Sequence, residues 1–554
     1  MPPPIAPAAR LRADLDRLAD EVGAVAFGLP SVEQEGRRER RDHTVSVARD
    51  YLIPRLGDPD APLLVVVAGP TGSGKSTLVN SLAEKEVSSP GALRPTTRDP
   101  VVWCHTRHAD RYSEIGGVPC TVVADDHPLL EDIALVDTPD IDSYVAEHRR
   151  LTTRILRQAD VVIFLTSAQR YADAVPWQVL GEVDERGSVV VYVLNRLSRR
   201  ASGAVSDYAA LLRRHGLETG DIYAIQEQRV RGESGLLPAK SVAKILGRLR
   251  ELADHRREVV SEVTERAARH VVESARRTAA DVGAQDSERK RLEAVVDRIY
   301  ADAQEELTGE LDRGALVRRE VVDRWSERVG TGEVARWIRG SASWLRGVAD
   351  RLAGRPAAVV DEMEREARRE LTQAVTSRLG RAARAVSTAW DVDEEIRSLV
   401  TPDLRVIGES TEAEVERVID AWLASLTRLV EEEAPGRFRA ARVASTGMNA
   451  AAVGTILALF AATGGISGAE VGVAAGAAAA QQAALEQILG RAAARSLSGS
   501  ARDGLLGSIG QIFDSEADRY RRILEAASDP LARAAAIEEA AGAVERESEA
   551  FHAQ

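Results

Sequence analysis

The chain reads Gly69-Pro70-Thr71-Gly72-Ser73-Gly74-Lys75-Ser76 between the apolar run 63–68 and the stretch 77–82, for which we predict a helix. A strand, a glycine-rich loop and a helix in this order are typical of a Walker A phosphate loop. Glycines let backbone N–H groups approach a phosphate closely, and the helix N-terminus adds partial positive charge there. We therefore expect these residues and Thr77 to bind nucleotide, with Lys75 on the β- and γ-phosphates and the Ser76 hydroxyl on Mg²⁺.

A second motif follows the apolar run 133–136, where the chain continues Asp137-Thr138-Pro139-Asp140. A carboxylate at the end of such a strand is placed to hold Mg²⁺ through water, which makes Asp137 a metal candidate. The tetrapeptide resembles the Asp-x-x-Gly motif of GTPases, with Asp140 in place of the glycine. A carboxylate beside a phosphate is repulsive unless it points away, so Asp140 weighs against γ-phosphate sensing by this loop.

The segment 94–100, Arg-Pro-Thr-Thr-Arg-Asp-Pro, lies between the loop helix and the next predicted strand. GTPases place here a threonine that completes the Mg²⁺ shell, for which Thr97 is the first choice and Thr96 the alternative. Arg98, or alternatively Arg94, is expected to stabilise charge that develops on the phosphates. The catalytic candidates are therefore Lys75, Thr97 and Arg98, and the metal candidates are Ser76, Thr97 and Asp137.

A third motif, Asn195-Arg196-Leu197-Ser198, follows the apolar run 189–194. It resembles the guanine-reading Asn-Lys-x-Asp motif, so Asn195 and Arg196 are further nucleotide-binding candidates. Ser198 stands where that motif has its base-reading aspartate, and one hydroxyl cannot replace the paired hydrogen bonds of a carboxylate. GTP and ATP both remain open as the nucleotide. The stretch 238–241 is either a base-contacting loop or the start of a helix.

Composition narrows the class of protein. The chain has 554 residues and a formal net charge of −13. That charge argues against a general nucleic-acid binder, so no nucleic-acid partner is expected. The two cysteines, Cys104 and Cys120, suit a reducing compartment, and residues 1–5 lack the pattern of a signal peptide. We expect a cytoplasmic protein.

Proline divides the chain into two regions of different character. Of the 21 prolines, only Pro356, Pro402, Pro435 and Pro530 follow Pro238. Before residue 250, short apolar runs alternate with helical stretches, as in a mostly parallel sheet covered by helices. The predicted strands are 63–68, 101–105, 121–124, 133–136, 161–166, 189–194 and 222–225. After residue 250, amphipathic helical patterns predict a long all-α bundle or stalk, with Trp325, Trp337, Trp344, Trp390 and Trp422 in its core.

Residues 443–469 carry no charge, and after Glu470 the chain stays uncharged to residue 485. Gly464-Gly465 interrupts this apolar stretch, and the arm before it is shorter than the roughly 20 residues that span a bilayer. A helical hairpin that dips into one leaflet fits the break. An Ala-rich hairpin buried in the helical body, where small residues permit close approach, fits equally.

Together, the motifs and the helical regions on both sides of them resemble a bacterial dynamin-like protein, a large GTPase with a helical trunk and a membrane-touching tip. The resemblance rests on the motifs between residues 63 and 250 and otherwise on architecture. It implies GTP as substrate with Mg²⁺, self-association through the GTPase domain, a paralogous dynamin-like partner, and membrane remodelling or scaffolding, in some members at the division septum. It also places the protein on the inner face of the cell membrane. Dynamins carry a Gln-Ser pair where this loop has Thr71-Gly72.

The domain boundaries follow from this interpretation. They are 1–57 for N-terminal helices that pack with the stalk, 58–250 for a GTPase domain and 251–443 for the stalk. Residues 444–490 are the apolar hairpin, as a membrane tip or a buried hairpin, and 491–554 are C-terminal helices that return to the stalk. Two other functions stay open. One is a soluble, septin-like nucleotide switch or scaffold, and the other is a P-loop ATPase or transferase, although no second catalytic constellation accompanies the loop.

Overall fold

The computed structural model describes residues 7–88, 99–142, 146–171, 174–198, 203–217, 220–227, 235–312, 357–433 and 491–552. The chain forms two compact units. The first comprises residues 1–27, 33–284 and 529–554, and the second comprises residues 28–32 and 285–528. The predicted domain boundaries stay predictions; the first unit combines N-terminal helices, the sheet and the last helix of the chain.

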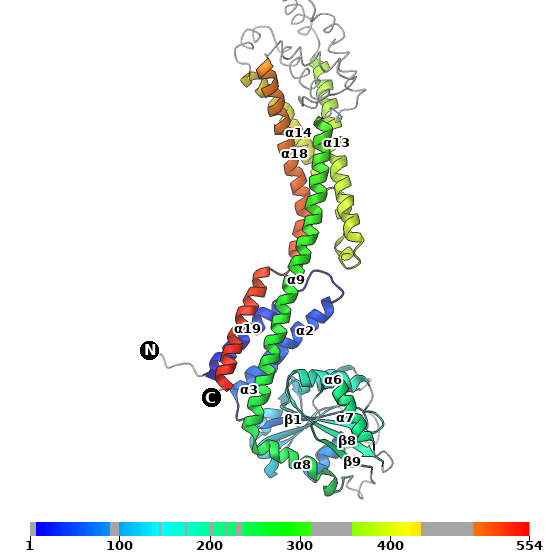
Figure 1. Ribbon diagram of the computed structural model, residues 1–554, viewed down its shortest axis with the longest axis vertical. Helices are drawn as coiled ribbons and strands as arrows, with labels where there is room; N and C mark the ends of the chain where they lie inside the picture. The colour runs from blue at the N-terminus through cyan, green and yellow to red at the C-terminus, as the bar shows by residue number, and fades with distance from the viewer. Residues whose placement is uncertain are drawn as a thin grey trace, which may run out of the picture. The chain divides into compact units, whose positions relative to one another are not determined.

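A seven-stranded sheet in the order β5-β2-β6-β1-β7-β8-β9 forms the centre of the first unit (Figure 1). Neighbouring strands are parallel except β2 and β6, which are antiparallel. The strands are β1 (Leu63–Ala68), β2 (Val101–His105), β5 (Thr121–Asp125), β6 (Ile133–Asp137), β7 (Val161–Ser167), β8 (Val189–Leu197) and β9 (Ile222–Gln226). All seven predicted strands are present, which confirms the mostly parallel sheet.

Both faces of the sheet are covered, as the central strand shows. Every residue of β1 is buried. Because successive side chains of a strand point to opposite faces, Val65 and Val67 join one apolar core while Leu64 and Val66 join another. The first core is completed by α4 (Lys75–Ala83), α8 (Ala239–Asp254) and α9 (Arg256–Asp312), and the second by α5 (Ala146–Leu156), α6 (Ala174–Glu185) and α7 (Ala204–Arg214). Burial on two sides explains why these strands read as unbroken apolar runs.

Shorter elements complete the first unit. They are the hairpin strands β3 (Glu114–Ile115) and β4 (Val118–Pro119) and the 3₁₀ helices η2 (Thr106–Tyr112) and η3 (Pro128–Glu131). Strands of two residues are too short to show a pattern in the sequence, so this hairpin was not among the predictions.

The N-terminal helices of the first unit are α1 (Pro7–Gly23), α2 (Gln34–Ser46), the π-helix η1 (Val47–Leu52) and α3 (Ile53–Gly57). Helix α1 has an apolar stripe at helical spacing that includes Leu11, Leu15 and Leu18, and this stripe is buried in the first core. Helix α19 (Leu531–His552) packs along α1 and is joined to it by the ion pairs Arg17–Glu539 and Arg10–Glu547. The two ends of the chain therefore stabilise the same unit.

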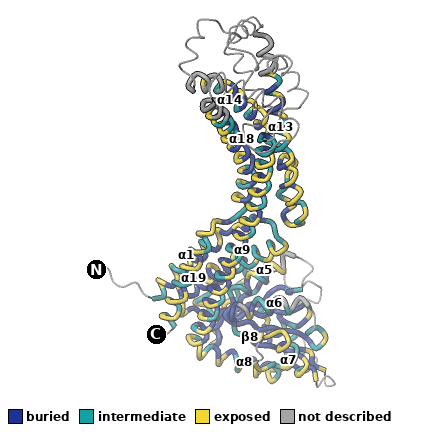
Figure 2. Tube along the Cα trace, turned by 45° about the horizontal axis from the view of Figure 1, so that its top comes forward, coloured by how far each residue is buried: buried dark blue, intermediate teal, exposed yellow. Residues whose placement is uncertain are grey.

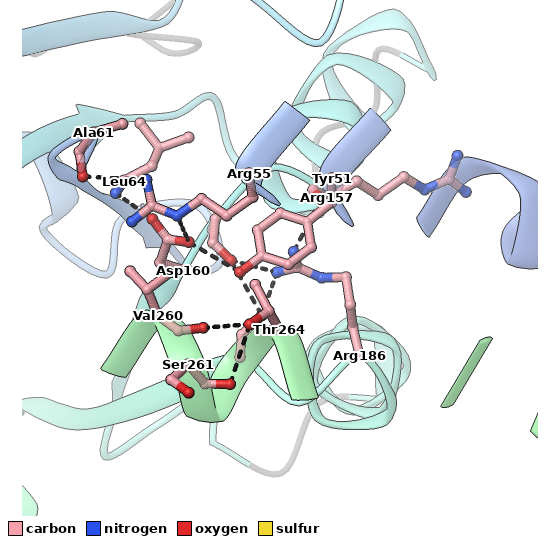
Figure 3. A network of polar contacts seen from close by, with 12 residues as sticks. Tyr51, Arg55, Ala61, Leu64, Arg157, Asp160, Arg186, Val260, Ser261 and Thr264 are labelled. Atoms are coloured by element: carbon pink, nitrogen blue, oxygen red, sulfur yellow. Dashed lines mark hydrogen bonds and ion pairs between the residues drawn. The ribbon is translucent and has the colours of Figure 1, made fainter. Parts of the chain in front are cut away.

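A buried polar network connects these helices to the sheet (Figure 3). The Asp160 carboxylate, 2% exposed, accepts hydrogen bonds from the Leu64 backbone N–H and from the Tyr51 hydroxyl, both at 2.9 Å. It also pairs with the Arg55 guanidinium at 3.2 Å. The Arg186 guanidinium lies 4.8 Å from the centre of the Tyr51 ring and donates to the Ala159 carbonyl at 2.7 Å. Because each charge has partners, burial of this network is tolerated.

The second unit is helical. Besides residues 285–312 of α9, it contains α13 (Ala357–Asp391), η4 (Ile396–Leu399), η5 (Pro402–Arg405), α14 (Thr411–Glu433) and α18 (Arg491–Ala527). Buried and exposed positions alternate along these helices (Figure 2). Their buried faces share one core that includes Tyr300, Trp390 and Tyr520. Ion pairs such as Arg502–Asp312 and Arg521–Asp297 join the polar edges of α18 to those of α9.

The bundle prediction is confirmed for this part of the chain. Trp390 and Trp422 lie in the predicted core, 1% and 5% exposed. Trp325, Trp337 and Trp344 and the whole apolar stretch 443–485 lie outside the described residues. Among the helices of the described ranges, none is both long enough and apolar enough to cross a bilayer.

Candidate functional site

The loop between β1 and α4 has the backbone of a phosphate loop. Gly72 and Gly74 have φ angles of +74° and +101°, in the left-handed region where side chains are strained. A Cβ atom on Gly69 would lie 2.0 Å from the Leu165 carbonyl oxygen, and one on Gly74 would lie 2.7 Å from the Asn195 side-chain nitrogen. Glycine is therefore favoured at Gly72 by its conformation, required at Gly69 by the lack of space, and required at Gly74 for both reasons. The turn is closed by a hydrogen bond of 3.1 Å from the Ser73 N–H to the Pro70 carbonyl.

Lys75 is the first residue of α4, and its side chain is 5% exposed. The ammonium donates to the Gly69 carbonyl at 2.9 Å and forms an ion pair with Asp140. The side chain thus arches back over its own loop, where a nucleotide would place its β- and γ-phosphates. The Asp140 carboxylate therefore lies at the phosphate loop rather than pointing away from it.

Asp137 ends β6 and is fully buried. Its Oδ2 atom accepts a hydrogen bond of 2.6 Å from the Ser88 hydroxyl, and Ser76 also donates to the carboxylate. Within the described residues, its Oδ1 atom has no hydrogen-bond partner. Burial raises the pKa of Asp137, against the opposing effect of these hydrogen bonds and of Lys75.

This arrangement fits Mg²⁺. A buried carboxylate oxygen without a partner is costly, and a hard cation satisfies it. The Ser76 hydroxyl donates a hydrogen bond to the same carboxylate. Ser76 and Asp137 would therefore both be ligands of the ion, as the sequence predicts. No group of three or more His, Cys, Asp or Glu residues in the described ranges could hold a metal by itself. Water and the phosphates of the nucleotide would be further ligands, beside the predicted Thr97, which lies outside the described residues.

Asn195, near the end of β8, contacts the loop directly. Its side-chain N–H donates to the Ser73 carbonyl at 2.7 Å, and its side-chain oxygen accepts the Arg196 N–H at 2.8 Å. Arg196 has a φ angle of +54°, and its side chain is exposed. Asn195 therefore holds the phosphate loop against the end of β8. The stretch 238–241 is the start of a helix, since α8 begins at Ala239.

A further set of contacts connects Thr71 to residues that the sequence did not single out. The Asp142 carboxylate accepts hydrogen bonds from the Thr71 N–H at 2.6 Å and from the Thr71 hydroxyl at 2.8 Å. The Arg170 guanidinium pairs with Asp142 at 2.6 Å and donates to the Thr71 carbonyl at 3.1 Å. Burial opposes ionisation of Asp142, but these hydrogen bonds outweigh it and lower its pKa.

The structure brings the predicted nucleotide-binding residues 69–77, Asn195 and Asp137 to one edge of the sheet. Thr97 and Arg98, with the alternatives Arg94 and Thr96, lie outside the described residues. The segment after Asp137 and the turn after β7 supply Asp142 and Arg170, which sequence reasoning missed. No local motif marks either residue; the only available signal was that β1, β6 and β7 are neighbours whose ends meet at the loop.

The fold and this loop define a nucleotide-binding domain of the P-loop GTPase class. Residues 64–196 match the family described as 50S ribosome-binding GTPase, so this part of the chain is a GTPase domain. Similar proteins include the probable transmembrane GTPase FZO-like, chloroplastic, of Arabidopsis thaliana, 30% identical over 26% of this chain and 16% of that protein. GTPase Der of Rhodopirellula baltica is 30% identical over 32% of this chain and 37% of its own length. The chain thus spans well under half the length of these curated relatives.

Among solved structures, the chain is similar to a member of an oligomerised bacterial dynamin pair described as sensing and tethering membranes. That match has a TM-score of 0.44 and 12% identity, over 98% of this chain and 94% of the other. It is also similar to Era of Aquifex aeolicus, with a TM-score of 0.25 and 19% identity over 34% of this chain and 56% of the other. The resemblance to dynamin-like large GTPases is confirmed at the level of a GTPase domain combined with a long helical region.

Proposed function

We propose that the chain binds GTP together with Mg²⁺ and hydrolyses it, and that it acts as a dynamin-like GTPase. In this proposal the nucleotide state drives self-association and the remodelling or scaffolding of a membrane. The observation that carries the nucleotide part is the buried Asp137 Oδ1 atom, which has no hydrogen-bond partner among the described residues and lies beside Ser76 at the start of the helix that follows the phosphate loop.

The roles of the residues follow from their chemistry. The loop amides and the N-terminus of α4 attract the phosphates, and Lys75 neutralises charge on the β- and γ-phosphates. Ser76 and Asp137 hold Mg²⁺, which would neutralise the charge on the same phosphates. We assign Thr97 as the ligand that would complete the Mg²⁺ coordination shell, and Arg98 as the group that stabilises the charge that develops on the phosphates during hydrolysis.

The first test is a competition between GTP and ATP for a fluorescent GTP analogue. GTP should displace the analogue far more effectively than ATP, and Lys75→Ala should abolish binding with its circular dichroism spectrum unchanged. Lys290→Ala is the matched control because this exposed lysine lies on α9, in the second unit. Preferential displacement by ATP, or unchanged analogue binding by Lys75→Ala, would contradict the proposal.

The second test concerns Thr97. Thr97→Ala should reduce the rate of GTP hydrolysis more than it reduces GTP affinity, since a ligand that completes the metal shell acts chiefly on the transition state. Equal losses of rate and affinity would remove Thr97 from this role.

The membrane part of the proposal rests on the apolar stretch 443–485, whose one charged residue is Glu470, and on the dynamin-like resemblance. We propose that this stretch touches lipid at the inner face of the cell membrane, with a paralogous dynamin-like chain as a partner, at the division septum. The full chain should sediment with liposomes, and a chain without residues 448–485 should not. A deletion that lowers the melting temperature sharply, in a chain that never binds liposomes, would instead support a soluble, septin-like scaffold.

A further inference from the structure

Arg170 lies beside the phosphate loop, in the turn that follows β7. It follows the end of β7 in a turn closed by hydrogen bonds from the Arg170 and Tyr171 N–H groups to the Ser167 carbonyl. Strand β7 is a parallel neighbour of β1, so their carboxyl ends lie at one edge of the sheet, where parallel α/β proteins bind ligands. The guanidinium donates to the carbonyl of Thr71, in the interior of the loop, at 3.1 Å.

Arg170 pairs with the Asp142 carboxylate in this structure. One oxygen of Asp142 accepts the Thr71 N–H and the Thr71 hydroxyl, and the other pairs with Arg170 at 2.6 Å. Three donors therefore converge on one anion. One of them is a backbone N–H of the phosphate loop, a group whose position in such loops serves phosphate oxygens.

Lys75, at the end of the loop, is also a cationic group paired with a carboxylate of the segment after β6. Its ammonium pairs with the carboxylate of Asp140, which lies two residues before Asp142. The backbone between them is also attached to the loop, since the Ile141 N–H donates to the Gly69 carbonyl at 3.4 Å. A single segment, 140–142, thus places one carboxylate on each of two cationic groups at the loop. Carboxylates stand in for phosphates because both are anions that accept several hydrogen bonds.

We propose that Arg170 is a phosphate-binding residue of this site, beside Lys75, and that the γ-phosphate of the nucleotide takes the place that Asp142 occupies on Arg170 and on the Thr71 N–H. The inference rests on the proposed GTP binding and adds to it a residue that distinguishes triphosphate from diphosphate. A guanidinium suits this task because its N–H groups bind two oxygens at once. Segment 140–142 leaves the loop when the triphosphate arrives, which makes its position a direct report of the nucleotide state.

A purely structural role for Arg170 predicts a different result from the Asp142 variant. If the Arg170–Asp142 pair only braces the loop, loss of either partner weakens all nucleotides alike. If Asp142 competes with the γ-phosphate, its neutralisation strengthens triphosphate binding while loss of Arg170 weakens it.

The test is isothermal titration calorimetry of the full chain with GDP and with GMP-PNP, a triphosphate analogue that is not hydrolysed. Arg170→Ala should weaken GMP-PNP by ~10-fold or more, the effect of one charge-assisted hydrogen bond, and leave GDP within ~3-fold. Asp142→Asn should tighten GMP-PNP several-fold, and Arg170→Lys should fall between the wild type and Arg170→Ala. Arg213→Ala, on the exposed side of α7, is the matched control and should bind both nucleotides as the wild type does.

Equal binding of GMP-PNP by Arg170→Ala and by the wild type would overturn the inference and leave the proposed function intact. So would an Asp142→Asn variant that binds GMP-PNP and GDP more weakly by the same factor. A wild-type chain that binds neither nucleotide would overturn the proposed function itself. Thermal melting of each variant shows whether the fold is retained, and the Arg170→Lys variant carries the test if Arg170→Ala does not fold.

Discussion

Asp160 offers the sharpest test of how the first unit is held together. Its carboxylate is 2% exposed and receives the Leu64 N–H, the Tyr51 hydroxyl and the Arg55 guanidinium (Figure 3). Asp160→Ala removes the acceptor from all three and leaves a buried guanidinium without its counter-ion. Removing one partner of a buried ion pair costs about 3–5 kcal/mol, chiefly because the other charge stays buried.

Graded substitutions separate the contributions. Asp160→Asn keeps an acceptor oxygen and loses only the charge, so we expect a cost of about 1–3 kcal/mol. Tyr51→Phe removes one hydrogen bond and should cost about 1 kcal/mol. Asp16→Ala is the matched control, since the Asp16–Arg49 pair is exposed and such pairs contribute only about 0–1 kcal/mol.

The assay is urea unfolding followed by circular dichroism, together with hydrogen exchange of peptides from β1. Because the chain has two units, only the transition of the first unit should move, and the Leu64 amide should lose protection in Asp160→Ala. The reasoning is refuted if Asp160→Ala lies within about 1 kcal/mol of Asp16→Ala, or if protection of β1 is unchanged.

Three further predictions concern the loop. Gly69→Ala should abolish nucleotide binding and lower the free energy of unfolding by about 1–3 kcal/mol, because its Cβ would meet the Leu165 carbonyl at 2.0 Å. The control Gly247→Ala, in open space on α8, should raise the free energy of unfolding by about 0.5–1 kcal/mol. Fluorescent-nucleotide titration and thermal melting measure these effects, and a Gly69→Ala variant that still binds nucleotide would contradict the geometry. Asn195→Ala frees the loop from β8 and should weaken GTP by about 10-fold in the same titration; unchanged affinity would show that the bond to Ser73 does not support the loop. Asp142 has a lowered pKa in the folded chain, so its contribution to stability is present above its ordinary value of 3.8 and is lost as the pH falls through the lower folded value. Without nucleotide, Asp142→Asn should therefore be less stable than the wild type in urea at pH 7, and the difference should shrink as the pH falls below 3.8. A constant difference would exclude this linkage.

The strands could be predicted because the residues that bury each strand are consecutive in the sequence. Each is a short apolar run, and β1 is buried on both faces, so its sequence has no polar gap to obscure it. The phosphate loop was predictable for the same reason, since Gly69 to Ser76 are consecutive and form one contiguous motif. Helix α1 shows its core face at helical spacing, which is again local information.

The missed contacts are not local. Thr71, Asp142 and Arg170 belong to three segments, and their meeting depends on β1 lying between β6 and β7 in the sheet. Asp140 could be recognised from the sequence as a carboxylate near the loop, but its pairing with the Lys75 ammonium could not. A sequence shows which residues carry charge; the strand order decides which of those charges meet.

The pairing of α1 with α19 also governs how the chain is made. Ala26 donates its N–H to the carboxylate of Asp529, 503 residues further on, and α19 begins two residues after that. Because synthesis proceeds at ~5–20 residues per second, α19 is made about half a minute to two minutes after α1. Over that interval Leu11, Leu15 and Leu18 lack part of the surface that buries them. A chain cut short before α19 keeps its phosphate loop but leaves this stripe open to chaperones, to proteases and to other nascent copies of itself.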